Sequence, residues 1–155
     1  MTSLYQTLQT SDDSFGVANF SDLRRYSPAE IRLTIQSLMN DERIDLALAL
    51  GDAGMSLYPN SEDMLAINGL LAATQQDWGS AIEHLLSLSE IQGERVQPFT
   101  YLMLVRCLRC DLEVAFAKDV LRIALEKYPD DPSLKSQAEE LASDDGSFFV
   151  ESKAT

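Results

Sequence analysis

Two short stretches of the sequence end an apolar, helix-like run in the same way. SLYPNSEDM (56–64) and EKYPDDPSL (126–134) each carry Tyr-Pro, then Asn or Asp, and then a polar or acidic residue. The two prolines, Pro59 and Pro129, lie 70 positions apart. A punctuation mark that recurs at a fixed distance is typical of a chain built from structural repeats, and a repeat constrains the fold more than any other sequence feature.

Small residues place the repeat length at half that distance. Ala47 stands twelve positions before Pro59, and Ala117 stands twelve positions before Pro129. Ala81 lies between them, 34 residues after Ala47 and 36 residues before Ala117. The spacing predicts a repeat of about 34 residues with one helix–turn–helix each, and a two-residue insertion in SEIQGERVQP.

Helix signals agree with this register. Ser27-Pro28-Ala29-Glu30 combines an N-cap, a proline at the first helical position and a capping-box glutamate. Ser61 and Pro98 open the next repeats, and Pro132 opens a final amphipathic run. We therefore predict an all-α chain of about seven helices, with Ala47, Ala81 and Ala117 at helix crossings. Its segments are a partly helical N-terminal extension (1–26), a repeat domain (27–142) with repeats at 28–61, 62–97 and 98–131 and a polar-faced capping helix at 132–142, and a flexible acidic tail (143–155).

Composition limits the classes of partner. With 45% hydrophobic residues the chain can form one compact domain. Its net charge of −13 would repel nucleic acids and anionic membrane surfaces. No signal peptide is expected, because the N-terminus lacks a basic and then an apolar region. No apolar run approaches the roughly 20 residues that span a bilayer, and two cysteines fit a reducing cytoplasm.

The chain resembles tetratricopeptide-repeat (TPR) proteins. The positions that match the helix-A pattern of that family are Ile31, Thr34, Ile35 and Leu38, then Leu65, Asn68, Gly69 and Ala72, then Tyr101, Leu104, Val105 and Leu108. Gly69 is expected where two helices approach closely. The first repeat lacks this glycine, and the second has Gly93 where the other repeats have proline. The resemblance implies a TPR-like helix-turn-helix solenoid of three repeats plus the capping helix.

A narrower resemblance concerns the third repeat. The chain is similar in size, acidity and repeat number to the class II chaperones of bacterial type III secretion, which bind translocator proteins. Pro98-Phe99, Cys107-Leu108 and the turn with Leu112, Glu113 and Ala115 resemble the third repeat of these chaperones. QQDWGSAIEHL also resembles Hrp-type secretion proteins with TPR repeats. The resemblance implies a cytoplasmic chaperone that binds a secreted partner.

Stacked helix pairs form a concave surface lined by the first helix of each pair in similar repeats. The register places ten residues in this partner-binding groove: Arg32, Gln36, Met39, Ala66, Leu70, Ala73, Phe99, Leu102, Arg106 and Arg109. Its apolar middle would accept side chains of a protein or peptide segment. The alternative for each residue is packing against the N-terminal segment 1–26.

Residues that could support catalysis are few. Cys107 and Cys110 form Cys-x-x-Cys inside an apolar helical run, and we expect structural, buried or half-buried thiols. Zinc needs about four ligands, and His84, the only histidine, lies in another repeat from the two cysteines with no second pair of thiols, so no metal is expected. Trp78 is expected to pack at the turn within the second repeat. No phosphate loop, nucleophile elbow or His-Glu metal motif is present, so we expect neither enzyme activity nor a cofactor.

Two functional classes remain from the sequence. The first is a protein-binding adaptor or secretion chaperone with an exposed groove. The second is a structural or assembly subunit that self-associates, as a homodimer or within a larger complex, through apolar residues such as Phe99 or Phe148-Phe149. We expect no nucleic-acid partner and no direct membrane insertion.

Overall fold

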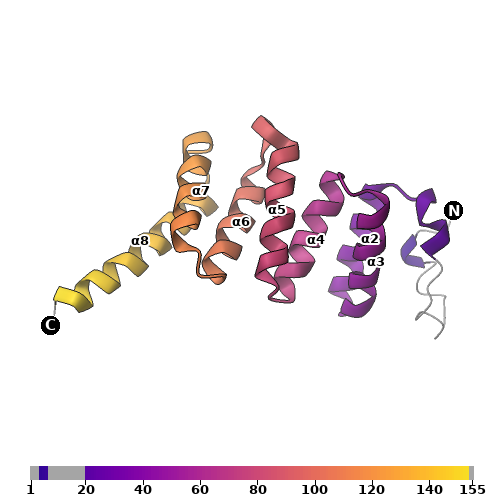
Figure 1. The fold of residues 1–155 in the computed structure, drawn as a ribbon, viewed down its shortest axis with the longest axis horizontal. Helices are drawn as coiled ribbons and strands as arrows, with labels where there is room; N and C mark the ends of the chain where they lie inside the picture. The colour runs from indigo at the N-terminus through magenta and orange to yellow at the C-terminus, as the bar shows by residue number, and fades with distance from the viewer. Residues whose placement is uncertain (1–3, 7–19, 154–155) are drawn as a thin grey trace. The chain divides into compact units, whose positions relative to one another are not determined.

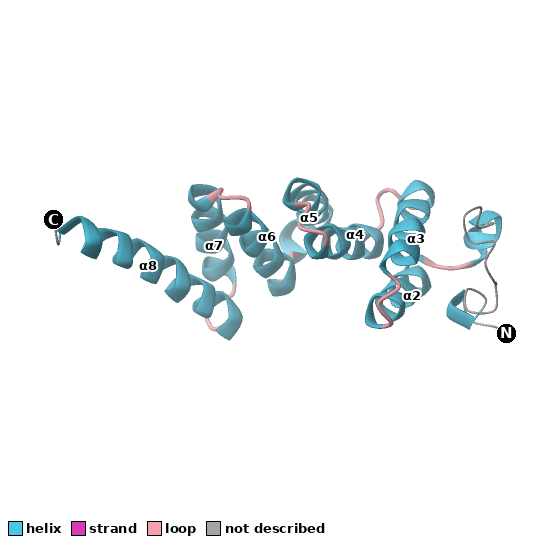
Figure 2. Ribbon diagram, turned by 90° about the horizontal axis from the view of Figure 1, so that it is seen from below, coloured by secondary structure: helices cyan, strands magenta, loops and turns pink. Residues whose placement is uncertain are grey.

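A computed structural model describes the backbone of residues 4–6 and 20–153, and the side chains of residues 4–6 and 23–143. The chain forms two compact units, residues 1–91 and 92–155, which we describe separately. Helices joined by short loops make up most of the described backbone (Figures 1 and 2). The described residues contain no strand, so the predicted all-α class is confirmed.

Seven α-helices lie between residues 20 and 153, as the repeat register predicts. The first unit contains a 3-10 helix, η2 (Phe20–Arg25), and the helices α2 (Pro28–Asn40), α3 (Ile44–Leu57), α4 (Glu62–Thr74) and α5 (Trp78–Gln92), whose last residue is assigned to the second unit. The second unit contains η3 (Gly93–Arg95), α6 (Pro98–Cys110), α7 (Val114–Lys127) and α8 (Pro132–Lys153).

Local capping explains where the helices begin. Ser27 and Glu30 form the predicted capping box: the Glu30 N–H donates to Ser27 Oγ at 3.2 Å, and the Ser27 N–H donates to Glu30 Oε2 at 2.8 Å. The Met64 N–H donates to Ser61 Oγ at 3.3 Å at the start of α4. The Leu134 N–H donates to an Asp131 carboxylate oxygen at 3.0 Å at the start of α8. These bonds satisfy amide groups that have no partner inside the helix.

The turns inside the three helical hairpins share one geometry. Glu42, Gln76 and Leu112 each adopt a positive φ, of 59°, 59° and 63°. The next residue then donates its N–H back across the turn, from Arg43 to Leu38, Asp77 to Ala72 and Glu113 to Leu108, at 2.8–2.9 Å. This bond pattern is the Schellman motif that closes many helix C-termini. The three turns lie 34 and 36 residues apart, which is the spacing of the three alanines.

The Tyr-Pro signal has a structural role. The Tyr58 hydroxyl donates to the Tyr26 carbonyl at 2.9 Å, and the Tyr128 hydroxyl donates to the Val96 carbonyl at 2.6 Å. Each bond connects the end of a hairpin to the backbone two residues before its first helix, across 32 residues. We call this bond the tyrosine lock. It ties together both ends of the α2–α3 hairpin and of the α6–α7 hairpin.

The core of the first unit lies among α2, α3 and α4, each of which packs on the other two. It contains Leu4, Leu23, Ile31, Ile35, Leu38, Leu46, Ala47, Leu50, Met64, Ile67 and Leu71. A Cβ on Gly54 would lie 2.6 Å from Met64 Sδ, so this glycine permits the close approach of α3 and α4. A Cβ on Gly69 would lie 3.2 Å from Leu85 Cγ, which confirms the predicted close approach of α5 to α4.

In the second unit, α7 packs against both α6 and α8. Its buried residues include Leu104, Val105, Leu108, Ala117, Val120, Leu121, Ala124, Leu134 and Leu141. Ala47, Ala81 and Ala117 are all fully buried, as expected for helix crossings. Helix α8 begins at the predicted Pro132 but continues to Lys153, beyond the predicted end of the capping helix at residue 142. No proline follows Pro132 to interrupt its backbone hydrogen bonds.

Candidate partner-binding surfaces

Six of the ten predicted groove residues lie on two neighbouring helices of the first unit. They are Arg32, Gln36 and Met39 on α2, and Ala66, Leu70 and Ala73 on α4, and all six are half-buried. Their spacing puts each set of three on one face of its helix. Because α2 and α4 are in contact, an ion pair can cross between them: Arg32 Nη1 lies 3.1 Å from an Asp63 carboxylate oxygen. We call these six residues the first-unit face.

Part of this surface also belongs to the core. Met39 and Leu70 pack against the core cluster to which Leu4 and Leu23 of the N-terminal segment contribute. The Tyr5 hydroxyl donates to an Asp41 carboxylate oxygen just beyond the end of α2. Residues of segment 1–26 and residues of the first-unit face thus belong to, or pack on, the same apolar cluster.

The other four predicted residues lie on α6 in the second unit. The Phe99 side chain is 52% exposed, Leu102 is half-buried and Arg106 is exposed. Arg109 has partners within the unit, since its Nη1 donates to Gln137 Oε1 and to Glu140 Oε2, both at 2.8 Å. The guanidinium of Arg109, a predicted groove residue, thus binds a carboxylate of α8. This bond fixes α8 against α6.

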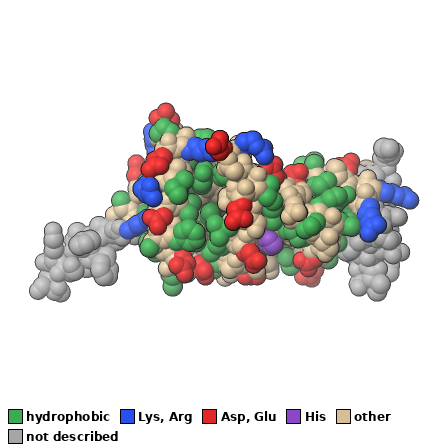
Figure 3. Space-filling model, turned by 45° about the horizontal axis from the view of Figure 1, so that its top comes forward, with side chains coloured by type: hydrophobic (Ala, Val, Ile, Leu, Met, Phe, Trp, Pro, Cys, Tyr) green, Lys and Arg blue, Asp and Glu red, His purple; other side chains and the backbone are tan. Residues whose placement is uncertain are grey.

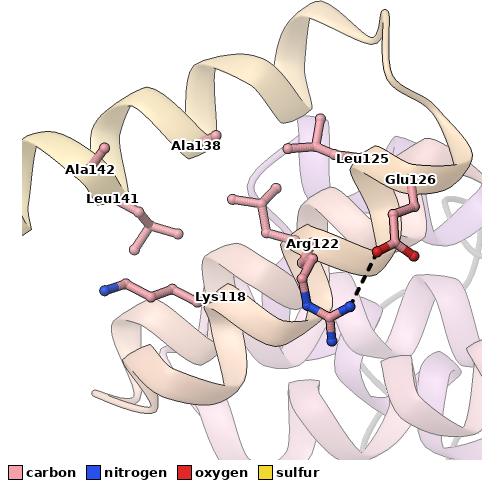
Figure 4. A pocket seen from close by; sticks show the side chains of 8 residues that line it. Lys118, Arg122, Leu125, Glu126, Ala138, Leu141 and Ala142 are labelled. Atoms are coloured by element: carbon pink, nitrogen blue, oxygen red, sulfur yellow. Dashed lines mark hydrogen bonds and ion pairs between the residues drawn. The ribbon is translucent and has the colours of Figure 1, made fainter.

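A further surface, absent from the predicted set, is an open groove of about 580 Å³ between α7 and α8. Its apolar lining consists of Leu121, Leu125, Ala138, Leu141 and Ala142. Figure 4 shows Lys118 of α7 and Leu141 of α8 on opposite sides of the groove. The only sequence signal for this groove was a pair of small residues, Ala138 and Ala142, four positions apart in the predicted capping helix.

The charged lining of this groove comes from α7. It consists of Lys118, Arg122 and Glu126, and Arg122 Nη1 lies 3.2 Å from Glu126 Oε1 (Figure 4). Both side chains of this pair are mostly exposed, so the pair is screened by water and can exchange partners at small cost. The α7 wall therefore carries two cationic groups and one carboxylate, in a chain whose net charge is −13.

Other exposed apolar side chains also gather in the second unit. Leu112, in the turn between α6 and α7, is 85% exposed, and Val114, Phe116 and Ile123 of α7 are also exposed. The space-filling view in Figure 3 shows hydrophobic side chains interspersed with charged ones on the surface. Exposed apolar groups of this kind are common at protein–protein contact sites.

The cysteines differ from each other more than the sequence indicated. Cys107 is buried, whereas Cys110 is exposed, and both are free thiols. Burial, with a smaller effect from Cys110, raises the pKa of Cys107 to about 11. A thiol with so high a pKa is a poor nucleophile at neutral pH. The expectation of buried or half-buried thiols holds for Cys107 and is wrong for Cys110.

Two further features concern metal ligation and the turn before α5. The described residues contain no group of three or more His, Cys, Asp or Glu side chains that could hold a metal ion. Asp77 accepts a hydrogen bond from the Ser80 N–H at 3.2 Å, and hydrogen bonds from Ser80 lower the pKa of Asp77. Trp78 is the first residue of α5 and is half-buried, next to the turn at which it was predicted.

No model of a known protein family matches the chain, and no curated protein matches its sequence. Within the described part of the chain, every helix is too short or too polar to cross a bilayer.

Proposed function

We propose that the chain is a non-enzymatic, protein-binding adaptor of the TPR type. Three observations support this proposal: three hairpins with the same turn, a spacing of 34 and 36 residues between the turns, and a buried alanine at the same position in each second helix. Proteins built from such repeats bind partners through the first helices of the hairpins. In this proposal α8 is the capping helix of a short solenoid.

The first-unit face is the observation that carries the binding proposal. Its residues recur at the same register positions on two packed helices, and half-buried apolar groups stand beside Arg32 and Gln36. Such a face can bury leucine or proline side chains of an extended or helical segment, which stabilises a complex by roughly 1.5–3 kcal/mol per side chain before ordering costs. Arg32 and Gln36 would then hydrogen-bond the backbone of that segment and fix its direction.

The narrower proposal is a cytoplasmic chaperone of a bacterial type III secretion system that binds a secreted partner. Its support is the resemblance of α6 and the following turn to the third repeat of such chaperones, together with the acidic composition. Phe99 and Leu102 would extend the binding surface in the second unit, and Arg106 would contribute a salt-sensitive contact.

Leu70→Glu tests the adaptor proposal, because it places an unpaired charge in the first-unit face. We expect the variant to lose a native partner that wild-type protein retains in pull-downs from host cells. Ser56→Glu, at an exposed position of α3, is the matched control and should retain the partner. Both variants must keep wild-type helicity by circular dichroism. Normal partner binding by folded Leu70→Glu would eliminate this face as the site.

A second candidate function, a self-associating assembly subunit, is favoured by the exposed apolar side chains of α7. It requires concentration-dependent association in analytical ultracentrifugation, and Phe116→Asp should weaken that association. A wild-type protein that stays monomeric at all concentrations without its partner would eliminate this alternative.

A further inference from the structure

We propose that the groove between α7 and α8 binds one amphipathic helix of a partner protein, with carboxylates on the side of that helix that faces α7. This surface shares no residue with the first-unit face or with the predicted residues of α6. The proposal therefore goes beyond the adaptor function above and can fail independently of it.

A difference between two equivalent helix crossings explains why this groove is open. Residues 70 positions apart are equivalent in the two units, so the α7–α8 crossing corresponds to the α3–α4 crossing. At α3–α4, a Cβ on Gly51 would lie 2.7 Å from Asn68 Oδ1 and 2.9 Å from Leu71 Cδ1. The two helices are therefore in close contact at Gly51.

The equivalent positions in the second unit are occupied differently. Leu121 replaces the glycine, and Ala138 replaces the asparagine. The leucine side chain needs space between the helices, while the alanine leaves space unfilled. Leu121 and Leu141 are both buried at this crossing, and the open volume lies beside them, next to Leu125 and Ala142.

The first unit indicates the shape of the occupant. In the first unit, α4 follows α3 and is covered by another helix, α5, which approaches at Gly69 and Leu85. Helix α8 follows α7 in the same register, but no helix of the described residues follows α8 onto the corresponding surface. In the first unit, a helix thus covers the α4 position that corresponds to Glu139 of α8. Helix-in-groove binding uses apolar anchors at helical spacing, and Leu121, Leu125 and Leu141 can contact them.

The charges of the lining indicate the polarity of the occupant. Lys118, Arg122 and Glu126 of the α7 wall sum to one positive charge, in a chain whose net charge is −13. Glu139, which is exposed, follows the lining residue Ala138 on α8, at the position equivalent to Gly69. A bound helix with carboxylates toward α7 and neutral or basic residues toward α8 complements both helices. This polarity also fixes the direction and rotation of the helix in the groove.

Two synthetic peptides test the proposal on the full chain with ¹³C-labelled leucine methyl groups. Both peptides are amphipathic helices of about 18 residues, or five turns, with the same leucine face. One carries Glu and the other Lys along one edge of that face. At about 50 mM salt we expect the Glu peptide to bind about tenfold more tightly, and the preference to shrink at about 500 mM salt. The methyl signals of Leu121, Leu125 and Leu141 should shift.

Variants make the test specific to this groove. Arg122→Glu should weaken binding of the Glu peptide by about tenfold and should not weaken binding of the Lys peptide. Leu125→Glu should abolish binding of both peptides. Ile123→Glu, an exposed position on another face of α7, is the matched control and should bind like wild type. Leu70→Glu should also bind the peptides normally, which separates this surface from the first-unit face.

Three results would overturn the proposal. The first is the absence of binding by either peptide. The second is equal affinity for the Glu and Lys peptides at low salt. The third is a set of shifts centred on leucines outside the groove, such as Leu102.

Discussion

The α2–α3 and α6–α7 hairpins end in a tyrosine lock, whereas the α4–α5 hairpin does not. At the position equivalent to Tyr58 and Tyr128, the middle hairpin has Gln92, whose side-chain oxygen accepts a hydrogen bond from the Thr100 hydroxyl at 3.1 Å. Gly93 follows with a φ of 57°, where the other hairpins have proline. In the outer two hairpins, the tyrosine hydroxyl binds the backbone before the first helix of the same hairpin. In the middle hairpin, Gln92 binds Thr100 of the next helix, α6, instead.

This difference shows how two residues can change the role of a repeat junction. Tyr-Pro closes a hairpin on itself, because the hydroxyl binds the backbone before the first helix and the proline cannot continue the second. Gln-Gly leaves the hairpin end without that bond and permits a left-handed backbone at the junction. The division between the two compact units falls at the same place, between Ile91 and Gln92.

The largest effect on stability is expected at the helix crossing of the α4–α5 hairpin, which has no tyrosine lock. Ala81 is fully buried, so Ala81→Leu should overpack the crossing and lower the free energy of unfolding by about 1–3 kcal/mol. Urea denaturation monitored by circular dichroism measures the loss. Ala117→Leu gives the matched loss in a locked hairpin. An unchanged midpoint for Ala81→Leu would contradict the assigned register.

The tyrosine locks can be broken one at a time. Tyr58→Phe and Tyr128→Phe each remove a hydroxyl that donates to a backbone carbonyl, and each should destabilise by about 1 kcal/mol in urea titrations. The control is Tyr26→Phe, which removes a nearby tyrosine hydroxyl and keeps the Tyr26 carbonyl that accepts the bond from Tyr58. If both lock variants unfold like this control, the hydroxyl bonds add nothing and the Tyr-Pro signal reflects helix termination alone.

Gly93→Ala tests whether the positive φ after α5, where the hairpin has no tyrosine lock, strains a residue other than glycine. No heavy atom lies within 4 Å of a Cβ at this position, so any loss comes from the positive φ and not from a clash. We expect a loss of about 1 kcal/mol in the free energy of unfolding. Gly79→Ala is a suitable control, since it also has free space but lies inside α5, where alanine should stabilise slightly. Equal effects of the two substitutions would argue against strain at Gly93.

Leu112→Gly makes the complementary change in a locked hairpin. Leu112 has a φ of 63° and is 85% exposed, so glycine removes backbone strain at little cost in packing. The expected gain is about 0.5 kcal/mol, because relief of strain is partly offset by the greater freedom of glycine in the unfolded chain. Thermal unfolding provides the measurement. A clear loss of stability would show that the leucine side chain makes contacts that its exposure conceals.

The two cysteines should differ in their reactivity toward an alkylating agent. At pH 8 iodoacetamide should modify the exposed Cys110 well before Cys107, whose buried thiol has a pKa of about 11. Intact-protein mass spectrometry follows the two steps, and urea should make the rates similar. Because the unfolded thiol ionises near its ordinary value of 9.0, the Cys107 contribution to stability is present below that pH and is lost as the pH rises toward 11. Equal rates in the folded protein would contradict the burial of Cys107.

The sequence by itself determined the helix starts, the repeat register and the turns. The starts of α2, α4 and α6 were predicted from Ser27, Ser61 and Pro98, because caps and N-terminal prolines act within one helical turn. The repeat register followed from three alanines that must be small wherever two helices cross. The presence of a turn after each first helix followed from the same register.

Contacts between distant segments were decided only by the tertiary structure. The sequence marked Tyr58 and Tyr128 but not the carbonyls that their hydroxyls bind, because each partner lies 32 residues away. It marked Arg109 as a groove residue, whereas the fold brings Glu140 within 2.8 Å of its guanidinium. The positive φ of Leu112 had no sequence signal, because leucine does not favour that conformation. The α7–α8 groove depends on Leu121 and Ala138 meeting at one crossing, and only packing determines whether such a pair fills the space between two helices or leaves it open.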